Sequence, residues 1–459
     1  MTSRTSPIAL GILAVGALLA AGVWIGINLT GSSAPVAADR GDEPAPAPDG
    51  EDTDAADSGE DAAGTPTDAD SDDTDVNDSV GSEREEPLED GVVRTERAIA
   101  TSGTHTCARH PDGGVSCWGR DDRGQSGGTS VSNEPAPTTR IDGLEDVTVT
   151  DLAVEGRISC ALTSDEDLWC WGGLQNPNDS SDRRPLRGGG ARQVFGFADQ
   201  PAVTAMDAGP HHVCGVLADG TLHCIGYDHA RQLGHFEETT PGVNAFEQVE
   251  HVADVVDVAV GFDHTCALHD DGRVSCWGDN EHRQLGDHTL DASRDPVVVE
   301  GVDNAVSLVG APWRSCAIDH TGAVTCWGAN LPGGPADQGT TPPVELPMFD
   351  RVATISHHSW EVCAVETDSQ LRCVGESALL LDDELQASQP PVDLDPFGLL
   401  DDAPVMDVGV SARSCAVMAD GEVRCWGLGS DGLLGGAYRP SHGPLWLPPS
   451  PVVDLDPVG

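Results

Sequence analysis

Residues 266–276, Cys-Ala-Leu-His-Asp-Asp-Gly-Arg-Val-Ser-Cys, carry the pattern that decides the fold of this 459-residue chain. The Asp-Asp-Gly turn at 270–272 has a glycine where a three-residue hairpin loop needs a left-handed backbone. Antiparallel partners pair outward from a turn, so Cys266 should lie directly opposite Cys276. The stretch therefore predicts a β-hairpin with both sulfur atoms on one face.

The same cysteine spacing occurs seven times and accounts for all 14 cysteines: Cys107 with Cys117, Cys160 with Cys170, Cys214 with Cys224, Cys266 with Cys276, Cys316 with Cys326, Cys363 with Cys373, and Cys415 with Cys425. The first members of successive pairs lie 47 to 54 residues apart. A repeat of this length is typical of a propeller, a solenoid or an array. Glu166 and Ser369 replace the turn glycine in the second and sixth units, where we expect less regular turns.

The even count and constant spacing favour seven disulfides and an oxidising compartment. Each bridge should contribute about 2–3 kcal/mol by closing a short loop. The alternative is that the cysteines are reduced and pack as small apolar side chains. A zinc site is disfavoured, because structural zinc ligands have a shorter spacing and no histidine follows in every unit.

The amino-terminal region divides into three segments that precede the repeats. Residues 1–6 form a short leader containing Arg4, and residues 7–30 include an uncharged apolar run at 8–27 that is long enough to span a membrane. The leading positive charge favours an anchor with the rest of the chain outside the cytoplasm. A cleaved signal peptide is the alternative, and it would make the protein secreted.

Residues 31–91 should form a disordered acidic linker rich in Asp, Ala and Pro. Within 31–90 there are 21 acidic residues and two arginines, a net charge of −19. The linker should be extended by its own repulsion. The remaining segment, 92–459, has a net charge of −35 and no lysine, which argues against binding nucleic acid and excludes lysine-based catalysis.

Most units continue after the second cysteine with Trp-Gly, as in Trp277-Gly278, and several then carry Gln-Leu-Gly, as at 232–234 and 284–286. This repeat resembles that of the regulator-of-chromosome-condensation (RCC1-like) family, and the chain resembles an exported bacterial member. The resemblance covers 92–459 and implies an all-β fold, a monomeric seven-bladed β-propeller. Apolar runs such as 255–260 should be the innermost strands. The last run, 451–453, could pair with the first blade and close the ring.

Two motifs have both a functional and a structural interpretation. Residues 124–128, Gly-Gln-Ser-Gly-Gly, resemble a protease nucleophile loop but occupy the Gln-Leu-Gly position, so we interpret them as a turn. His105, His212 and His264 share one repeat position, where we expect bonds to nearby backbone rather than metal binding. We expect no catalytic residue, no cofactor-binding residue and no metal ligand.

Five of the ten tryptophans belong to the Cys-Trp-Gly sequences, where core packing explains them. Trp313 and Trp360 lie in loops, and we select these two as binding anchors. The leading hypothesis is a non-catalytic, membrane-tethered module at the periplasm or cell surface, with a protein or surface glycan as partner. The alternatives are guanine-nucleotide exchange on a small GTPase, the activity of the family's namesake, and inhibition of a secreted enzyme by a β-lactamase-inhibitor-like propeller.

Overall fold

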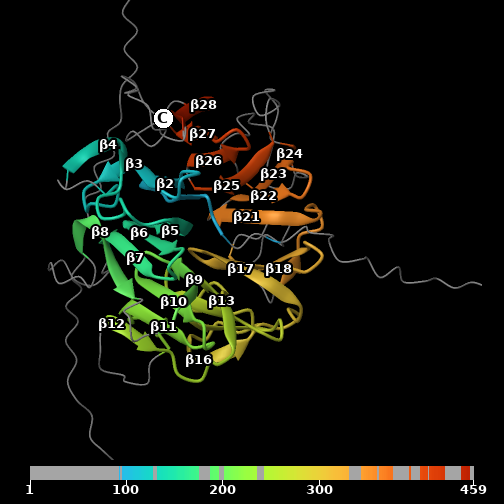
Figure 1. Cartoon of the computed structure of the whole chain (residues 1–459). Coiled ribbons are helices and arrows are strands. Elements are labelled where there is room, and N and C mark those ends of the chain that lie inside the picture. Colours follow the sequence, from blue (N-terminus) through green and yellow to red (C-terminus); the bar gives the residue numbers. More distant parts are fainter. Residues whose placement is uncertain are drawn as a thin grey trace, which may run out of the picture. The chain divides into compact units, whose positions relative to one another are not determined.

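The computed structural model describes residues 93, 96–127, 132–174, 187–195, 201–234, 242–329, 343–358, 361–375, 392–393, 404–411, 413–428 and 446–454. These residues form seven antiparallel sheets, each built from four strands that are consecutive in the chain. The innermost strand of each sheet contacts the innermost strands of both neighbouring sheets, and the last sheet contacts the first. The sheets therefore close a ring, which can be followed by the strand labels in Figure 1. The predicted all-β, seven-bladed propeller is confirmed.

The strands occupy four equivalent positions in the seven blades. The innermost strands are β1 (Ile99–Thr101), β5 (Val149–Glu155), β9 (Val203–Ala208), β13 (Val255–Val260), β17 (Ala305–Ala311), β21 (Val352–His358) and β25 (Val405–Gly409). The second strands are β2 (His105–Arg109), β6 (Ile158–Thr163), β10 (His212–Leu217), β14 (His264–His269), β18 (Arg314–Asp319), β22 (Glu361–Glu366) and β26 (Arg413–Met418). The third strands are β3 (Val115–Asp121), β7 (Leu168–Gly173), β11 (Leu222–Tyr227), β15 (Val274–Gly278), β19 (Val324–Gly328), β23 (Leu371–Gly375) and β27 (Glu422–Leu428). The outer strands are β4 (Ser132–Arg140), β8 (Arg187–Phe195), β12 (Gly242–Gln248), β16 (Ser293–Val298), β20 (Val344–Glu345), β24 (Val392–Asp393) and β28 (Trp446–Asp454).

No helix among the described residues is long and apolar enough to cross a bilayer. The sequence predicted an anchor from the apolar run at 8–27 and a linker from the acidic segment at 31–91. Both segments lie outside the described residues.

The second and third strands of each blade form the predicted hairpin. Cys266 is paired directly with Cys276, and the other six pairs have the same register. Every pair forms a disulfide with a Cα–Cα distance of 4.0–4.1 Å. This short distance identifies a non-hydrogen-bonded pair, where opposing side chains are closest. A sulfur bridge therefore fits the ladder at the same point in every blade.

The seven bridges join the cysteines that the spacing pairs, each within one hairpin. They are Cys107 to Cys117, Cys160 to Cys170, Cys214 to Cys224, Cys266 to Cys276, Cys316 to Cys326, Cys363 to Cys373, and Cys415 to Cys425. All of them lie among the described residues, and none of these cysteines is a free thiol. The alternative of reduced cysteines packed as small apolar side chains therefore does not describe this structure.

The hairpin turns keep the same left-handed residue with or without glycine. Gly272 has a φ of 81°, and the turns of units two and six place Glu166 and Ser369 at 62° and 66°. The Glu166 amide donates to the Thr163 carbonyl at 2.9 Å, the distance at which Gly272 donates within its own turn. The expected irregularity of these two turns is therefore wrong. The flanking hairpin fixes the turn, and a side chain occupies a conformation that costs about 1–2 kcal/mol.

Adjacent blades pack the cysteine face of one sheet against the tryptophan face of the next. In one such layer, Leu268 and Cys266 of the fourth blade pack with Leu308, Ala317 and Trp327 of the fifth. The repeated tryptophans are at most 2% exposed: Trp118, Trp171, Trp277, Trp327 and Trp426. The predicted core role of these five side chains is confirmed.

The ring closes through side chains rather than through an exchanged strand. β28 pairs with β27 of its own blade, with Val453 opposite Val423, so the expectation that residues 451–453 join the first blade is wrong. Asp407 on β25 instead accepts hydrogen bonds from the amides of Ala98 at 2.6 Å and Ile99 at 3.1 Å. Ala98 immediately precedes β1 and Ile99 is its first residue, so one carboxylate joins the last blade to the first.

Two other aspartates bind the next blade in the same way. Asp207 on β9 accepts a hydrogen bond from the Val260 amide at 2.8 Å, and Asp257 on β13 accepts one from the Leu308 amide at 2.9 Å. Each carboxylate thus satisfies a backbone donor that faces the channel and has no partner within its own sheet. The closing junction at Asp407 therefore resembles the internal junctions.

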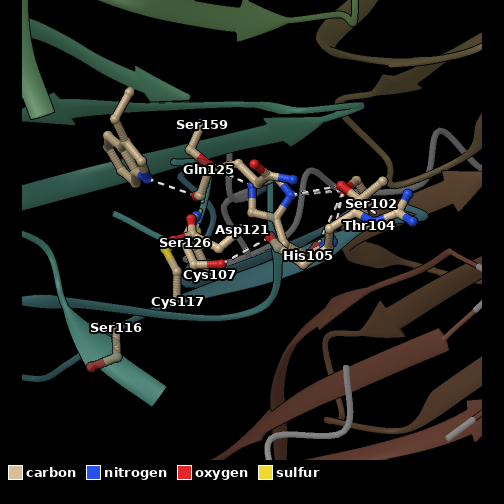
Figure 2. The surroundings of a disulfide bond; sticks show 12 residues. Ser102, Thr104, His105, Cys107, Ser116, Cys117, Asp121, Gln125, Ser126 and Ser159 are labelled. Carbon is tan, nitrogen blue, oxygen red and sulfur yellow. Dashed lines mark hydrogen bonds between the residues drawn. A yellow bond between two sulfur atoms is a disulfide. The ribbon is translucent and has the colours of Figure 1, made fainter. Parts of the chain in front are cut away.

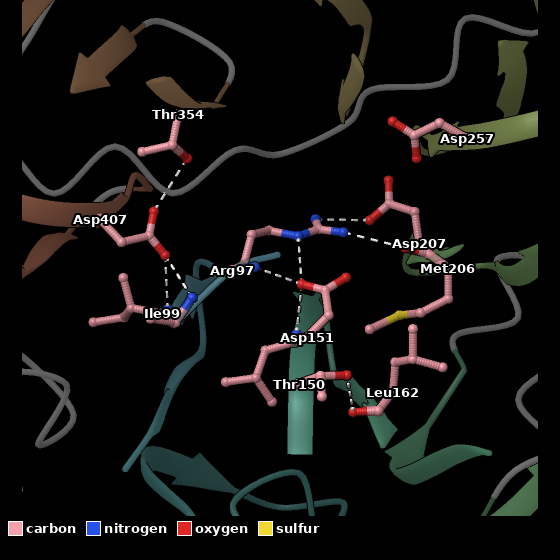
Figure 3. A network of polar contacts seen from close by, with 12 residues as sticks. Arg97, Ile99, Thr150, Asp151, Leu162, Met206, Asp207, Asp257, Thr354 and Asp407 are labelled. Atoms are coloured by element: carbon pink, nitrogen blue, oxygen red, sulfur yellow. Dashed lines mark hydrogen bonds and ion pairs between the residues drawn. The ribbon is translucent and has the colours of Figure 1, made fainter. Parts of the chain in front are cut away.

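The Arg97 side chain extends between these inner strands. Its Nη1 atom lies 3.0 Å from Asp207 Oδ1, and its Nε atom lies 3.5 Å from Asp151 Oδ1. Nη2 also donates to the Met206 carbonyl at 3.2 Å, as Figure 3 shows. Burial raises the pKa of Asp151 to about 6, although the Arg97 charge acts in the opposite direction. Arg97 therefore compensates carboxylates that are costly to bury.

Candidate functional site

A buried hydrogen-bond chain explains the repeated histidine position. His105 Nε2 lies 2.6 Å from Ser159 Oγ of the next blade, and that hydroxyl donates to the Gln125 carbonyl at 3.1 Å. Because the hydroxyl proton points to the carbonyl, His105 Nε2 must be the donor to Ser159. Trp171 Nε1 donates to the same carbonyl at 3.0 Å. Figure 2 shows His105, Ser159 and Gln125 of this hydrogen-bond chain.

The same chain recurs in the blades that follow. His212 bonds to Thr265 of the next blade at 2.7 Å, and Thr265 donates to the Gln232 carbonyl at 2.7 Å. His264 bonds to Ser315 at 2.9 Å. The sequence analysis expected bonds to nearby backbone, whereas the direct partners are hydroxyls of the neighbouring blade. These histidines join blades and are completely buried.

Residues 124–127 are the described part of the Gly-Gln-Ser-Gly-Gly stretch, and they belong to this hydrogen-bond chain. Ser126 is fully buried, its amide donates to Asp121 Oδ1 at 2.9 Å, and its hydroxyl donates to the Arg120 carbonyl at 3.0 Å. The equivalent Leu233 amide donates to Asp228 Oδ1 at 2.9 Å. A serine held in this way cannot act as a nucleophile, so the stretch is a turn that presents the Gln125 carbonyl to the next blade.

The buried imidazole of His105 predicts a loss of stability in acid. Burial lowers the pKa of His105 to about 3 from 6.5. The unfolded chain therefore binds a proton below pH 6.5 that the folded chain does not, and stability falls as pH drops from 6.5 toward 3. We expect the stability advantage of the wild type over His105→Gln to shrink by about 2 kcal/mol between pH 7 and pH 5. Urea unfolding at both pH values measures it, and an advantage independent of pH would contradict it.

One face of the propeller brings together several partly exposed aromatic and imidazole side chains. The turns between first and second strands and the loops after third strands emerge on the same face, because successive strands alternate in direction. We call this the loop face. In each unit, the residue three positions before the first cysteine lies in one of these turns. The described residues at this position are Thr104, Arg157, His211, Asp263 and Trp313.

Trp313 is half-buried on the loop face, in the turn between β17 and β18. Its ring makes an edge contact with Phe262 at a centroid distance of 5.2 Å, and with His282 at 5.9 Å. We call Phe262, His282 and Trp313 the aromatic patch. They come from the fourth and fifth blades, so a rigid junction holds them together. Trp360, the other predicted anchor, occupies the equivalent position in the sixth unit but lies outside the described residues.

A cluster of two imidazoles and a carboxylate adjoins the aromatic patch. His211 Nδ1 lies 2.6 Å from Asp263 Oδ1, and His229 Nε2 lies 2.9 Å from the same oxygen. The His211 and Phe262 rings are 6.1 Å apart, which connects the cluster to the patch. Burial acts to raise the pKa of Asp263, but hydrogen bonds from His211 and His229 lower it below its usual value.

Sequence reasoning missed this cluster. It considered the histidines two residues before the first cysteine and expected no metal binding there. One residue earlier, His211 and Asp263 of adjacent blades are within hydrogen-bond distance. His229 comes from a loop after a third strand, so no regular spacing in the sequence relates it to the other two.

Among the described residues, the central channel provides little room for a ligand. Two cavities of about 50 and 90 Å³ are lined in part by Arg97. Ligand pockets typically measure about 300–1,000 Å³, so these cavities have the size of a few water molecules. Burial raises the pKa of Glu155, which lines the smaller one, to about 7. The loop face is therefore the better candidate site.

Comparison with known proteins identifies the repeat. The model of the "Regulator of chromosome condensation (RCC1) repeat" family matches residues 97–125 and 255–284. The chain is 26% identical to the ultraviolet-B receptor UVR8 of Arabidopsis thaliana over 227 residues, which cover 48% of this chain and 49% of the receptor. This chain contains RCC1-like repeats. The RCC1 domain-containing mitochondrial protein RUG3 of the same plant is 29% identical over 203 residues, covering 41% of this chain and 43% of RUG3.

The RCC1-like chain thus matches about half or less of the length of these relatives. Two matching solved structures are only 17–18% identical in sequence, so they support the fold and no shared function. Prp20p of Saccharomyces cerevisiae is 18% identical with a TM-score of 0.59, over 79% of this chain and 87% of Prp20p. Human WBSCR16 is 17% identical with a TM-score of 0.54, over 68% of this chain and 83% of WBSCR16. Neither comparison assigns a ligand to the loop face.

Proposed function

We propose that this RCC1-like chain is an exported, membrane-tethered binding module without catalytic activity, whose loop face docks an envelope protein or a surface glycan. The aromatic patch carries the proposal. Trp313, Phe262 and His282 offer an apolar surface with polar edges, the kind of surface at which binding energy concentrates. The layer of buried bonds beneath holds the patch rigid, which reduces the entropy lost on binding.

The redox state and charge of the chain support export. Seven buried disulfides are typical of an oxidising compartment outside the cytoplasm. The net charge of −35 over residues 92–459 disfavours nucleic acid as a partner. The apolar run at 8–27 and the acidic segment after it provide the proposed anchor and spacer.

Replacing Trp313 by alanine is expected to weaken binding of the envelope partner at least tenfold, because an aromatic anchor contributes about 2 kcal/mol or more. The immobilised full chain and its Trp313→Ala variant are compared by capture from envelope extract, by a glycan array, and then by titration of the ligand recovered. Val306→Ala is the matched control, because Val306 is 42% exposed at the opposite end of β17.

The proposal fails if the Trp313→Ala variant binds as tightly as the wild type while both remain folded. It also fails if the purified chain turns over a substrate. Acceleration of guanine-nucleotide release from a small GTPase would instead favour the exchange activity considered as the alternative. Prp20p is described as binding Gsp1p and histones, and that description concerns Prp20p itself.

A further inference from the structure

Three ligand-type atoms converge on the loop face at the junction of the third and fourth blades. Nδ1 of His211, Nε2 of His229 and a carboxylate oxygen of Asp263 all lie within 4.8 Å of one another. His211 follows β9, His229 follows β11, and Asp263 lies between β13 and β14. Three separate turns therefore bring these atoms together, although the sequence has no metal-binding motif.

We propose that His211, His229 and Asp263 bind a zinc ion on the loop face, with the fourth coordination position open to solvent. Two imidazole nitrogens and one carboxylate oxygen form a donor set used by zinc sites that keep an open position. The carboxylate compensates part of the ion's charge, and the acidic surface of the domain attracts cations. The site stands independently of the proposed binding function.

The separations of the two imidazole nitrogens from the Asp263 carboxylate oxygen require only a small adjustment. Zinc binds imidazole nitrogen and carboxylate oxygen at about 2.0–2.2 Å, so tetrahedral ligands lie roughly 3.3 Å apart. The present separations from Asp263 Oδ1 are 2.6 Å for His211 and 2.9 Å for His229. Each imidazole nitrogen therefore needs to move away from Asp263 Oδ1 by roughly half an ångström. His229 reaches solvent and its ring can make this movement.

Hydrogen bonds now occupy the positions at which the metal would bind. The carboxylate of Asp263 accepts from both imidazoles, and a proton therefore sits on each ligand nitrogen. Zinc binding requires neutral imidazoles whose protons have moved to His211 Nε2 and His229 Nδ1. Gln232 Nε2 lies 3.3 Å from His229 Nδ1 and must give up this contact, while its Oε1 atom still accepts from the Ala230 amide at 2.8 Å.

A second group of potential ligands does not compete for the ion. Glu361 lies beside Cys363 and Cys373, but both sulfurs are joined in a disulfide and provide no thiolate. The other described cysteines are also in disulfides. Zinc bound stoichiometrically to the oxidised chain therefore points to imidazole and carboxylate ligands.

The test is titration of the tag-free, oxidised full chain with zinc by calorimetry, with excess calcium present to occupy weak carboxylate sites. We expect one saturable zinc ion per chain, and cobalt added in its place should give the visible absorption of a tetrahedral site. His229→Ala should weaken zinc binding at least tenfold, as should Asp263→Asn. The matched control is His320→Ala, which removes an exposed imidazole outside both the cluster and the aromatic patch and should leave the zinc affinity unchanged.

The inference is overturned if the wild type shows no saturable zinc binding, or if the His229→Ala variant binds zinc as tightly as the wild type. Circular dichroism and the urea midpoint establish that each variant is folded. Because His229 is at the surface, its replacement should preserve the fold even if Asp263→Asn does not. Binding of zinc alone is measured, so failure of this site leaves the test at Trp313 unaffected.

Discussion

Replacing Arg97 by methionine is expected to lower the free energy of unfolding by about 3 kcal/mol. The change keeps most of the side-chain volume but leaves Asp151 and Asp207 without a cation, and their side chains are only 8% and 6% exposed. Burial raises the pKa of Asp151, and without the opposing Arg97 charge this carboxylate takes up a proton at higher pH in the folded chain than in the unfolded chain. The loss of stability should therefore be greater at pH 8 than at pH 5. Urea unfolding at both pH values measures it.

Arg273→Met is the matched control, because Arg273 also pairs with an aspartate but its side chain is 59% exposed. A surface ion pair of this kind contributes about 0–1 kcal/mol. Combining Arg97→Met with Asp207→Asn should recover part of the lost stability, since asparagine carries no charge and its oxygen can still accept from the Val260 amide. Equal losses for the two arginine variants would contradict the proposed role of Arg97.

Reduction of all seven disulfides is expected to prevent folding. Each bridge closes a loop with a sequence separation of 10 and should contribute about 2–3 kcal/mol. Seven such contributions total about 14–21 kcal/mol, which equals or exceeds most of the range of net stability of a typical domain, about 5–15 kcal/mol. The chain is reduced in denaturant and then transferred to native buffer with or without reductant. Circular dichroism should show native strand content only where the disulfides re-form.

A single bridge provides the matched comparison. The double variant Cys316→Ala and Cys326→Ala should remain folded and lose about 2–3 kcal/mol, because the other six hairpins stay closed. The cysteines are at most 4% exposed, so reductant should reach them slowly in the folded chain. Refolding of the fully reduced chain to the wild-type midpoint would show that packing alone holds the blades.

Local patterns were sufficient to predict the hairpins, their pairing and the number of blades. The spacing of Cys266 and Cys276, the turn glycine and Trp277 each reflect contacts within one unit, and these contacts repeat. The resemblance to RCC1-like repeats then predicted the propeller. The error at residues 451–453 has a different cause. A strand pattern does not specify which sheet edge it joins, and β27 of the same blade was available.

The interactions between blades were beyond reach of the sequence. Arg97 precedes the first strand and has no repeat equivalent, so nothing local distinguishes it from a linker residue. Asp263 looks like a loop carboxylate until the ring brings His211 of one neighbour and His229 of another loop beside it. Trp313 could be selected because a large aromatic residue at a loop position is conspicuous by itself. A cluster formed by three separate turns can be predicted only when the arrangement of the blades in the ring is known.

The junction at Asp407 has a consequence for how the chain is made. Every blade consists of consecutive strands, so the strand pairing within a blade needs only that blade's own segment of the chain. The amide of Ala98 and the carboxylate that binds it are 309 residues apart. Until the seventh blade is complete, the apolar side of the first, including Ile99 and Trp118, has no neighbour to cover it. The nascent protein therefore exposes one apolar, aggregation-prone face through most of its translation. The last blade to be made is the one that covers it.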